Sequence, residues 1–283
     1  MEVSQVTTSD GIEWYVEQFH PTGNAHSTPT SPIVLIPSGE GDCHNLRALG
    51  KLLADAGYHT VSFDMPGYSR TKAPKEAYET ITPQLVTRQI ITLLDQLKIE
   101  KATFFGNSSG GGAVLALVAL YPERVVCGIV HEVPLGPPAL AVGDLAKKPD
   151  DELIRYLADF FRNRFIEQEN DGQTKWDALG PEYHARLEKN FLVWIHGMAR
   201  GRYTTQSLEL ATAENLRKRP VFWTVGALSD PEKFAKDFEV AEMAGIKVRT
   251  DVVRCLHFPY VTVPERLAEW VVECTRKVDS VKQ

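Results

Sequence analysis

The chain of 283 residues has the composition of an ordinary globular protein, with 43% apolar, 9% aromatic and 24% charged residues. These proportions exclude collagen, coiled coil and intrinsic disorder, and the length suits one large α/β domain with or without an insertion. The 31 basic and 37 acidic side chains give a formal net charge of −6, with no Lys/Arg cluster that would neutralise a row of phosphates. We therefore expect no nucleic-acid partner.

The sequence also argues against a membrane or secretory location. Its longest apolar run, residues 113–121, is nine residues long, whereas a membrane-spanning helix needs about 20. The first residues lack the basic start and apolar stretch of a signal peptide, so we expect an intracellular, cytoplasmic protein without membrane contact. No Cys-x-x-Cys pair and no zinc-type histidine spacing occurs, which predicts buried thiols rather than disulfides or a metal site. The four cysteines are Cys43, Cys127, Cys255 and Cys274.

Strands and helices are predicted to alternate along the first half of the chain. Residues 1–20 alternate polar and apolar side chains around a turn, as an antiparallel hairpin does, and a loop rich in Pro, Ser and Thr follows at 21–32. The next predicted strands are 33–37, 60–64, 103–105 and 125–133, and the helices between them are 46–56, 83–97 and 112–120. This alternation predicts an α/β fold with a mostly parallel, doubly wound sheet that binds ligands at the carboxyl ends of its strands.

The alternation stops after Pro134 and resumes near the end of the chain. Residues 137–219 contain amphipathic, aromatic-rich helical stretches and no convincing strand, which indicates an inserted helical cap. The later elements are strands at 221–225 and 247–253 and helices at 231–244 and 263–276. We therefore expect a core domain made of residues 1–136 and 218–283, with a cap, or lid, domain at 137–217.

The pattern G-x-S-x-G occupies residues 106–110, directly after the predicted strand 103–105 and before the predicted helix 112–120. In that context the pattern is typical of a nucleophile elbow, a tight turn that needs small neighbours and exposes the serine oxygen at a helix N-terminus. Five-residue matches are common by chance, so the position between strand and helix is what carries the hypothesis. Ser108 is predicted to be the nucleophile.

A serine hydroxyl needs a base within hydrogen-bond reach, and the base needs an acid that orients it. Of the eight histidines, His257 lies between the last predicted strand and the last helix, where the chain order of this fold places the base. Two acids fit the order serine, acid, histidine: Asp230 after strand 221–225, and Glu132 at the end of strand 125–133. Glu132 is also explicable as an ordinary strand-end carboxylate and Asp230 as a helix N-cap. The pattern alone favours Asp230 without closing the choice.

The oxyanion of an acyl-transfer intermediate needs backbone N–H donors, one after the nucleophile and one from a loop after an early strand. Ser109 occupies the first position. The loop at residues 37–41 offers the second through Gly39, because a glycine lets the backbone approach a ligand closely. A plain glycine-rich turn is the alternative for this loop. No Walker-type loop and no early G-x-G-x-x-G is present, so we expect neither a cofactor nor a metal.

Several blocks of the sequence together resemble the fungal zearalenone lactonases, α/β-hydrolases that open the macrocyclic ester of a resorcylic acid lactone. The similarity covers nearly the whole chain, and several blocks are more specific than G-x-S-x-G. They are residues 63–70, 106–110, 131–134, 184–190, 223–227 and 257–261. The resemblance implies a cofactor-independent carboxylic ester hydrolase that opens zearalenone-type lactones through an acyl-enzyme, and it also allows a homodimer.

The resemblance further implies roles for individual residues. It selects Glu132 over Asp230 as the acid. The implied triad is Ser108, Glu132 and His257, with an oxyanion hole formed by Gly39 and Ser109. The family's substrate-contacting cap tryptophan corresponds to Trp194, for which simple cap packing is the alternative. Further substrate-binding candidates, each also explicable as core, are Pro134, Phe258, Phe161, Met198 and Phe234.

Two other functions compete with this interpretation. A general carboxylesterase, or another lactonase of the same fold, would share the site, because a fold does not determine a substrate. A small-molecule receptor of the same architecture would keep a vestigial triad and bind its ligand without turnover. An intact serine, acid and histidine argues only weakly against a receptor, so turnover has to be measured.

Overall fold

An eight-stranded sheet forms the centre of the protein in a computed structural model that describes residues 1–21, 31–136, 142–166 and 171–280. The strand order is β1-β2-β4-β3-β5-β6-β7-β8. The β1–β2 and β2–β4 pairs are antiparallel, and the pairs from β4–β3 to β7–β8 are parallel. The strands are β1 (Glu2–Thr7), β2 (Glu13–Phe19), β3 (Ile33–Ile36), β4 (Thr60–Phe63), β5 (Ala102–Asn107), β6 (Val125–His131), β7 (Val221–Thr224) and β8 (Val248–Arg249).

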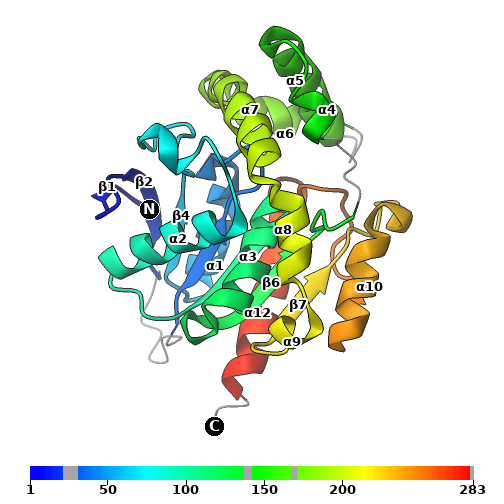
Figure 1. The fold of residues 1–283 in the computed structure, drawn as a ribbon. Coiled ribbons are helices and arrows are strands. Elements are labelled where there is room, and N and C mark those ends of the chain that lie inside the picture. The colour runs from blue at the N-terminus through cyan, green and yellow to red at the C-terminus, as the bar shows by residue number, and fades with distance from the viewer. Residues whose placement is uncertain (22–30, 137–141, 167–170, 281–283) are drawn as a thin grey trace.

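Helices cover both faces of this sheet. Every residue of β3, β4, β5 and β6 is buried, as expected for parallel strands that are packed on both sides. Two helices, α1 (Arg47–Asp55) and α12 (Pro264–Ser280), pack together on one face. The other face carries α2 (Pro83–Gln96), α3 (Ser109–Leu120) and α10 (Ala235–Ala244) (Figure 1). The central helix α3 is buried on all sides up to Ala119, so its position is fixed by packing all around.

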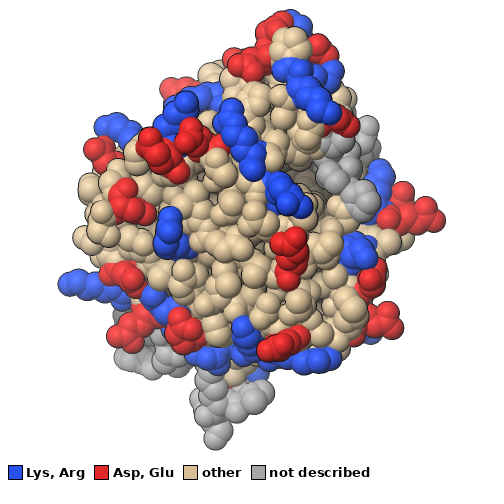
Figure 2. All heavy atoms as spheres, in the orientation of Figure 1, with Lys and Arg blue, Asp and Glu red and all other residues tan. Residues whose placement is uncertain are grey.

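The segment between β6 and β7 is helical where it is described. Its helices are α4 (Val142–Leu145), α5 (Asp150–Ile166), α6 (Gly172–Ala178), α7 (Pro181–Gly201), α8 (Tyr203–Leu210) and α9 (Ala213–Leu216). Figure 1 shows α4 to α7 projecting beyond the sheet, while α8 runs back along α3. The short helix α11 (Pro259–Thr262) precedes α12. Among the described helices, none combines the length and apolar character needed to cross a membrane. Basic and acidic side chains are interspersed over the face shown in Figure 2.

Most predicted elements are present with ends shifted by a few residues, including the hairpin of β1 and β2. The prediction of a strand over 247–253 is wrong in length, because β8 is an edge strand of only two residues, Val248–Arg249. The chain bends at residues 250–252 and ends the strand there, although Val253 beyond the bend still accepts a hydrogen bond from the N–H of Ala227. The helix predicted at 112 starts at Ser109 instead. Most of the loop predicted at 21–32 lies outside the described residues.

Candidate active site

Ser108 stands in the tight turn between β5 and α3. Its φ of 54° and ψ of −126° form a backbone conformation that residues other than glycine rarely adopt. The Ser108 N–H donates to the carbonyl of His131 at the end of the neighbouring strand β6, at 2.9 Å, which holds the turn in place. The turn thus presents Ser108 at the N-terminus of α3 and at the carboxyl end of the sheet.

The glycines on either side of Ser108 are required by close backbone approach. A Cβ on Gly106 would lie 2.3 Å from the carbonyl oxygen of Gly110. A Cβ on Gly110 would lie 2.6 Å from the carbonyl oxygen of Pro37. Neither distance is compatible with a side chain, so the two fixed glycines of the G-x-S-x-G pattern are explained by the geometry of this turn.

Asn107, the first variable residue of the pattern, ties the turn to two other loops. Its Nδ2 donates to the carbonyl oxygen of His131 at 3.2 Å and to that of His257 at 3.0 Å. The turn that carries Ser108 is therefore bonded to the segments that carry the acid and the base. Reasoning from sequence missed this residue, for which the only signal was its place inside the pattern.

Glu132 and His257 are in direct contact. Glu132 Oε2 lies 2.6 Å from His257 Nδ1, with the glutamate fully buried and 18% of the histidine side chain exposed. Asp230 is exposed, and its carboxylate accepts a hydrogen bond from the N–H of Glu232 at 3.0 Å, as an N-cap does. The structure places Glu132 beside the histidine, contrary to the preference for Asp230 that the strand pattern alone suggested.

The loop after β7, where the pattern suggested the acid, instead supplies hydrogen-bond donors to Glu132. Its Oε1 accepts from the N–H of Gly226 at 3.0 Å and from the hydroxyl of Ser229 at 2.5 Å. Burial alone would raise the pKa of Glu132, but the neighbouring His131 and His257 rings and the Ser229 hydroxyl lower it to about 2. The carboxylate is therefore ionised at neutral pH and can stabilise a positive charge on the His257 ring.

Ser108, Glu132 and His257 line one cavity of about 910 Å³, part of which is open to solvent. In this structure no hydrogen bond joins the side chains of Ser108 and His257, both of which belong to the described residues. Such bonds are often long in enzymes without a ligand and tighten when the substrate binds. The cavity thus brings together the three residues predicted as nucleophile, acid and base.

Gly39 and Ser109, the predicted oxyanion donors, line the same cavity beside Ser108. Gly39 lies in a turn closed by a hydrogen bond from the N–H of Gly41 to the carbonyl of Ser38, at 3.0 Å. Ser109 is the first residue of α3, where a backbone N–H has no partner within the helix. The Trp194 indole lies against Gly39, because a Cβ on Gly39 would be 2.3 Å from Trp194 Cε2. Only a glycine leaves room for that contact.

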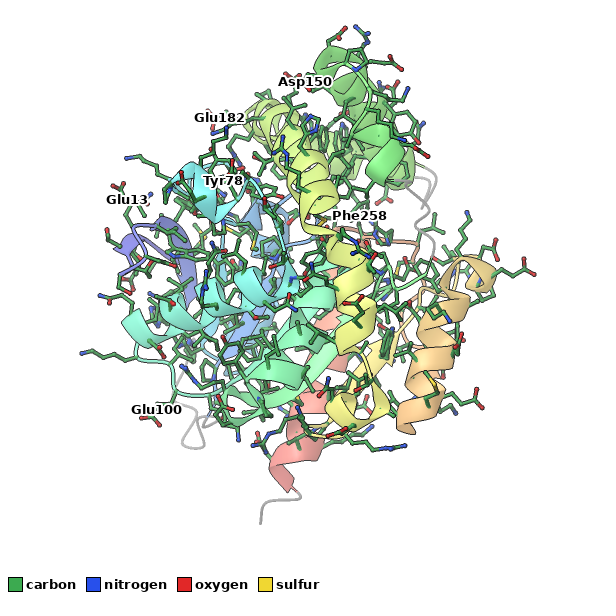
Figure 3. The ribbon with its side chains drawn as sticks, viewed as in Figure 1. Glu13, Tyr78, Glu100, Asp150, Glu182 and Phe258 are labelled. Carbon is green, nitrogen blue, oxygen red and sulfur yellow. The ribbon has the colours of Figure 1, made fainter. Side chains whose placement is uncertain are left out.

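The remaining wall of the cavity is mostly apolar and aromatic. All the predicted substrate-binding residues line it, namely Trp194, Pro134, Phe258, Phe161, Met198 and Phe234. The Phe161 ring contacts the rings of Trp194 and Phe258, with centroids 5.9 and 5.5 Å apart. Figure 3 shows Phe258 where the projecting helices meet the sheet-bearing part of the protein. Reasoning from sequence missed Phe160, Tyr203, Thr204 and Lys233, which also line the cavity.

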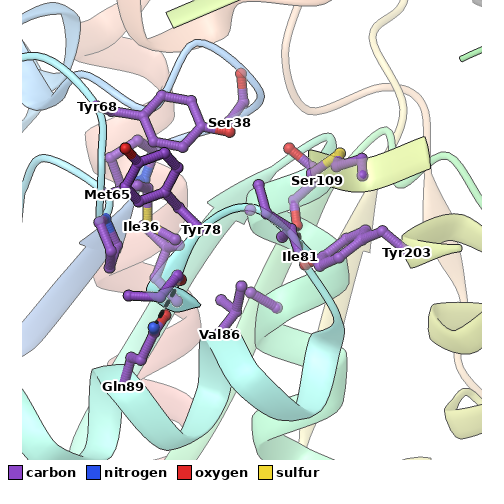
Figure 4. A pocket seen from close by; sticks show the side chains of 16 residues that line it. Ile36, Ser38, Met65, Tyr68, Tyr78, Ile81, Val86, Gln89, Ser109 and Tyr203 are labelled. Atoms are coloured by element: carbon purple, nitrogen blue, oxygen red, sulfur yellow. Dashed lines mark hydrogen bonds between the residues drawn. The ribbon is translucent and has the colours of Figure 1, made fainter. Parts of the chain in front are cut away.

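A smaller cavity of about 430 Å³ adjoins the first one. Ser38, Ser109, Met198 and Tyr203 line both cavities. Figure 4 shows the smaller cavity from close by, with Ser38 and Ser109 among its lining residues and an apolar wall below them. Of the two predicted oxyanion donors, Ser109 therefore lies between the two cavities, while Gly39 lines the larger one alone.

A buried group beside the site, Asp42, Cys43 and Asp64, has ligand types and spacing that would suit a metal ion. The guanidinium of Arg70 lies between the two carboxylates, 2.7 Å from Asp42 Oδ1 and 2.7 Å from Asp64 Oδ2. Arg186 of α7 makes a second ion pair with Asp42, also at 2.7 Å. Two cations neutralise these carboxylates, so the group is an ion-pair network that joins α7 to the loops after β3 and β4.

A serine in a strand-to-helix turn, a histidine–glutamate pair beside it and a mostly parallel sheet with helices inserted between β6 and β7 together define an α/β-hydrolase. A family model described as the alpha/beta hydrolase fold matches residues 31–175. The solved structure of the enol-lactonase from Burkholderia xenovorans LB400 is similar to this chain with a TM-score of 0.72 and 19% identity, covering 97% of this chain and 100% of that chain. That likeness shows the shared fold.

Two proteins are similar in sequence along nearly their whole length. The zearalenone hydrolase of Cladophialophora bantiana is 38% identical over 275 residues, covering 97% of both chains. The zearalenone hydrolase of Bionectria ochroleuca is 36% identical over 278 residues, covering 97% of this chain and 98% of that protein. The chain therefore belongs to the zearalenone hydrolase family, and it is a carboxylic ester hydrolase.

Proposed function

We propose that this enzyme opens the macrocyclic lactone ester of zearalenone-type resorcylic acid lactones through an acyl-enzyme on Ser108. The observation that carries the proposal is the 2.6 Å contact between Glu132 and His257 beside Ser108 in one aromatic cavity. The two full-length relatives, both named zearalenone hydrolases, support the choice of substrate.

In the first step His257 Nε2 takes the proton of Ser108 as the serine oxygen attacks the lactone carbonyl. A bond forms between Oγ and the carbonyl carbon, and the carbonyl electrons move to the oxygen, which becomes an oxyanion. The N–H groups of Gly39 and Ser109 hold this negative charge. The ionised Glu132 carboxylate stabilises the imidazolium that His257 has become.

The intermediate then collapses, and the bond between the carbonyl carbon and the ring oxygen breaks. His257 gives its proton to the departing alkoxide, which leaves as an alcohol. In a macrocyclic ester this alcohol remains attached to the acyl group on Ser108, so it competes with water for the acyl-enzyme. Water activated by His257 completes the reaction, releasing the open hydroxy acid and restoring the Ser108 hydroxyl.

The lining of the cavity suits a flat, apolar ring ligand. The Phe161 ring contacts the rings of Trp194 and Phe258. These aromatic surfaces can bury an aromatic lactone and exclude water from the reacting charges. Pro134, Met198 and Phe234 complete the proposed binding surface. The volume of about 910 Å³ lies within the range of sites for small organic ligands.

Turnover of zearalenone by the purified protein tests this proposal. Chromatography should show many equivalents of ring-opened product per enzyme, and a Ser108→Ala variant should lose this activity. Ser109→Ala keeps the backbone donor and should remain active. A single stoichiometric burst would indicate a receptor, and activity confined to short acyl esters would indicate a general carboxylesterase. Either result would overturn the proposal.

We also propose an intracellular location. The four cysteines are buried and form no disulfide, which is the usual state of thiols in a reducing compartment.

A further inference from the structure

One face of the long cap helix α7 lies on the loops that follow β3 and β4. Arg186, Asn190 and Trp194 follow one another at four-residue spacing and therefore share a face of the helix. Arg186 pairs with Asp42, and Trp194 lies against Gly39. Asn190, between them, takes no part in the acyl-enzyme mechanism proposed above.

Asn190 is completely buried and bonded to the loop that carries Gly39. Its Nδ2 donates to the carbonyl oxygen of Glu40 at 2.7 Å and to the hydroxyl of Ser69 at 2.8 Å. Its Oδ1 accepts from the N–H of Ser69 at 2.9 Å. Glu40 directly follows Gly39, so Asn190 holds the carbonyl one residue beyond the first oxyanion donor. Asn190 is not part of the cavity wall and has no route to the substrate.

The same loop is held from the core side by the Glu40 side chain. This buried carboxylate accepts hydrogen bonds from Asn45 Nδ2 at 2.7 Å and from the Tyr260 hydroxyl at 3.1 Å. It also accepts a hydrogen bond from the Ser38 hydroxyl. Hydrogen bonds from the core and from Asn190 therefore hold Ser38 and Glu40, the residues on either side of Gly39.

The second oxyanion donor has a corresponding tie. Tyr203, the first residue of α8, donates its hydroxyl proton to the carbonyl oxygen of Ser109 at 2.9 Å. Burial raises the pKa of Tyr203, so the hydroxyl stays protonated and remains a donor. Figure 4 shows Tyr203 beside Ser109 at the edge of the smaller cavity. The loop that carries Gly39 and the first residue of α3, Ser109, are thus each bonded, through a carbonyl, to the helical segment inserted between β6 and β7.

We propose that Asn190 and Tyr203 are positioning residues that hold the N–H groups of Gly39 and Ser109 where the oxyanion forms. This inference rests on the proposed acyl-enzyme mechanism. Ser109 stands between the two cavities and Gly39 lines the larger one, so neither donor is enclosed by packed side chains on every side. A displacement of about 1 Å at such a site can cost roughly 100-fold in rate, which gives these hydrogen bonds a catalytic consequence.

The test compares Asn190→Ala and Tyr203→Phe with the matched control Ser69→Ala. The control removes the Ser69 hydroxyl, which donates to Asp42 at 2.7 Å and accepts from Asn190, but it leaves the contact between Asn190 and Glu40. For each protein, kcat/KM for zearalenone and two affinities are measured. One is for an aryl trifluoromethyl ketone, which adds to Ser108 and generates an oxyanion. The other is for zearalenone in a Ser108→Ala background.

We expect Asn190→Ala and Tyr203→Phe each to lower kcat/KM and the ketone affinity by the same factor, roughly 10-fold or more. Zearalenone affinity should stay within about twofold, because the ground state makes little use of the oxyanion donors. Ser69→Ala should lower the thermal midpoint while keeping the ratio of the two affinities. Equal losses of both affinities, or a Ser69→Ala effect equal to that of Asn190→Ala, would overturn the inference.

Tyr203→Phe removes a single oxygen atom, so it tests the hydrogen bond that positions Ser109 even if Asn190→Ala fails to fold. If the wild-type protein hydrolyses activated aryl esters but not zearalenone, the proposed substrate is wrong. The ketone and an unreactive aryl ester analogue then provide the same comparison. The positioning role and the substrate are therefore tested separately.

Discussion

Glu132 is ionised, buried and held by hydrogen-bond donors from two segments, the loop after β7 and the segment of His257, and this distinguishes it from the exposed Asp230. We predict that Glu132→Gln lowers kcat by roughly 10³- to 10⁴-fold, because the His257 ring loses the charge that stabilises its protonated form. Asp230→Asn, a matched change of a carboxylate to an amide, should leave kcat within about twofold. Steady-state hydrolysis of zearalenone measures both. Loss of activity only in the Asp230 variant would refute the assignment.

Glu132 also makes the stability of the protein depend on pH. Its pKa is about 2 in the folded protein against an ordinary 4.5, so folding favours the ionised form. The resulting stabilisation, of the order of 3 kcal/mol, is complete above pH 4.5 and is lost as the pH falls towards 2. Urea unfolding at pH 7 and pH 3 should therefore show a smaller difference between wild type and Glu132→Gln at pH 3. A difference that stays constant with pH would contradict this prediction.

At the scale of elements, the turn from β5 into α3 depends on the absence of a side chain at Gly110. We predict that Gly110→Ala destabilises the protein by about 3 kcal/mol, because its Cβ would be forced against the Pro37 carbonyl. Gly143 of α4 is a matched control, because no atom of the described residues lies within 4 Å of an added Cβ, and Gly143→Ala should be neutral or slightly stabilising. Thermal unfolding compares the two. Similar midpoints would show that the turn can relax.

The buried strands were predictable from short apolar runs, because a parallel strand that is covered on both faces buries nearly all its side chains and is therefore apolar along its length. The turn around Ser108 was also predictable, because its glycines are required by contacts between backbone segments of the turn itself and of the adjacent strand. The choice between Glu132 and Asp230 was not local. It depends on which strand end lies beside His257, and the spacing along the chain permits both. Contacts such as that of Ser229 with Glu132 arise only from the tertiary fold.

The reactivity of the four buried thiols can be used to measure unfolding of the whole protein. We predict that 5,5′-dithiobis(2-nitrobenzoate) does not react with the native protein and titrates four thiols per chain in guanidinium chloride, since all four cysteines are buried without a disulfide. Cys127 lies in β6, Cys274 in α12, Cys43 between β3 and α1, and Cys255 after β8. Slow reaction under native conditions should follow the global opening rate, because these segments must separate to expose the thiols. Rapid reaction of one thiol in the native state would contradict the prediction.

Ser108 and Glu132 lie at the ends of the neighbouring strands β5 and β6, both encoded before the inserted helices, and only His257 comes after them. The nucleophile and the acid therefore lie on one continuous stretch of chain, which the inserted helices do not interrupt. Evolution or an engineer can exchange the insertion to alter which molecules are admitted without rebuilding the reactive pair. An exchanged insertion would need residues equivalent to Asn190 and Tyr203 to keep the full catalytic rate.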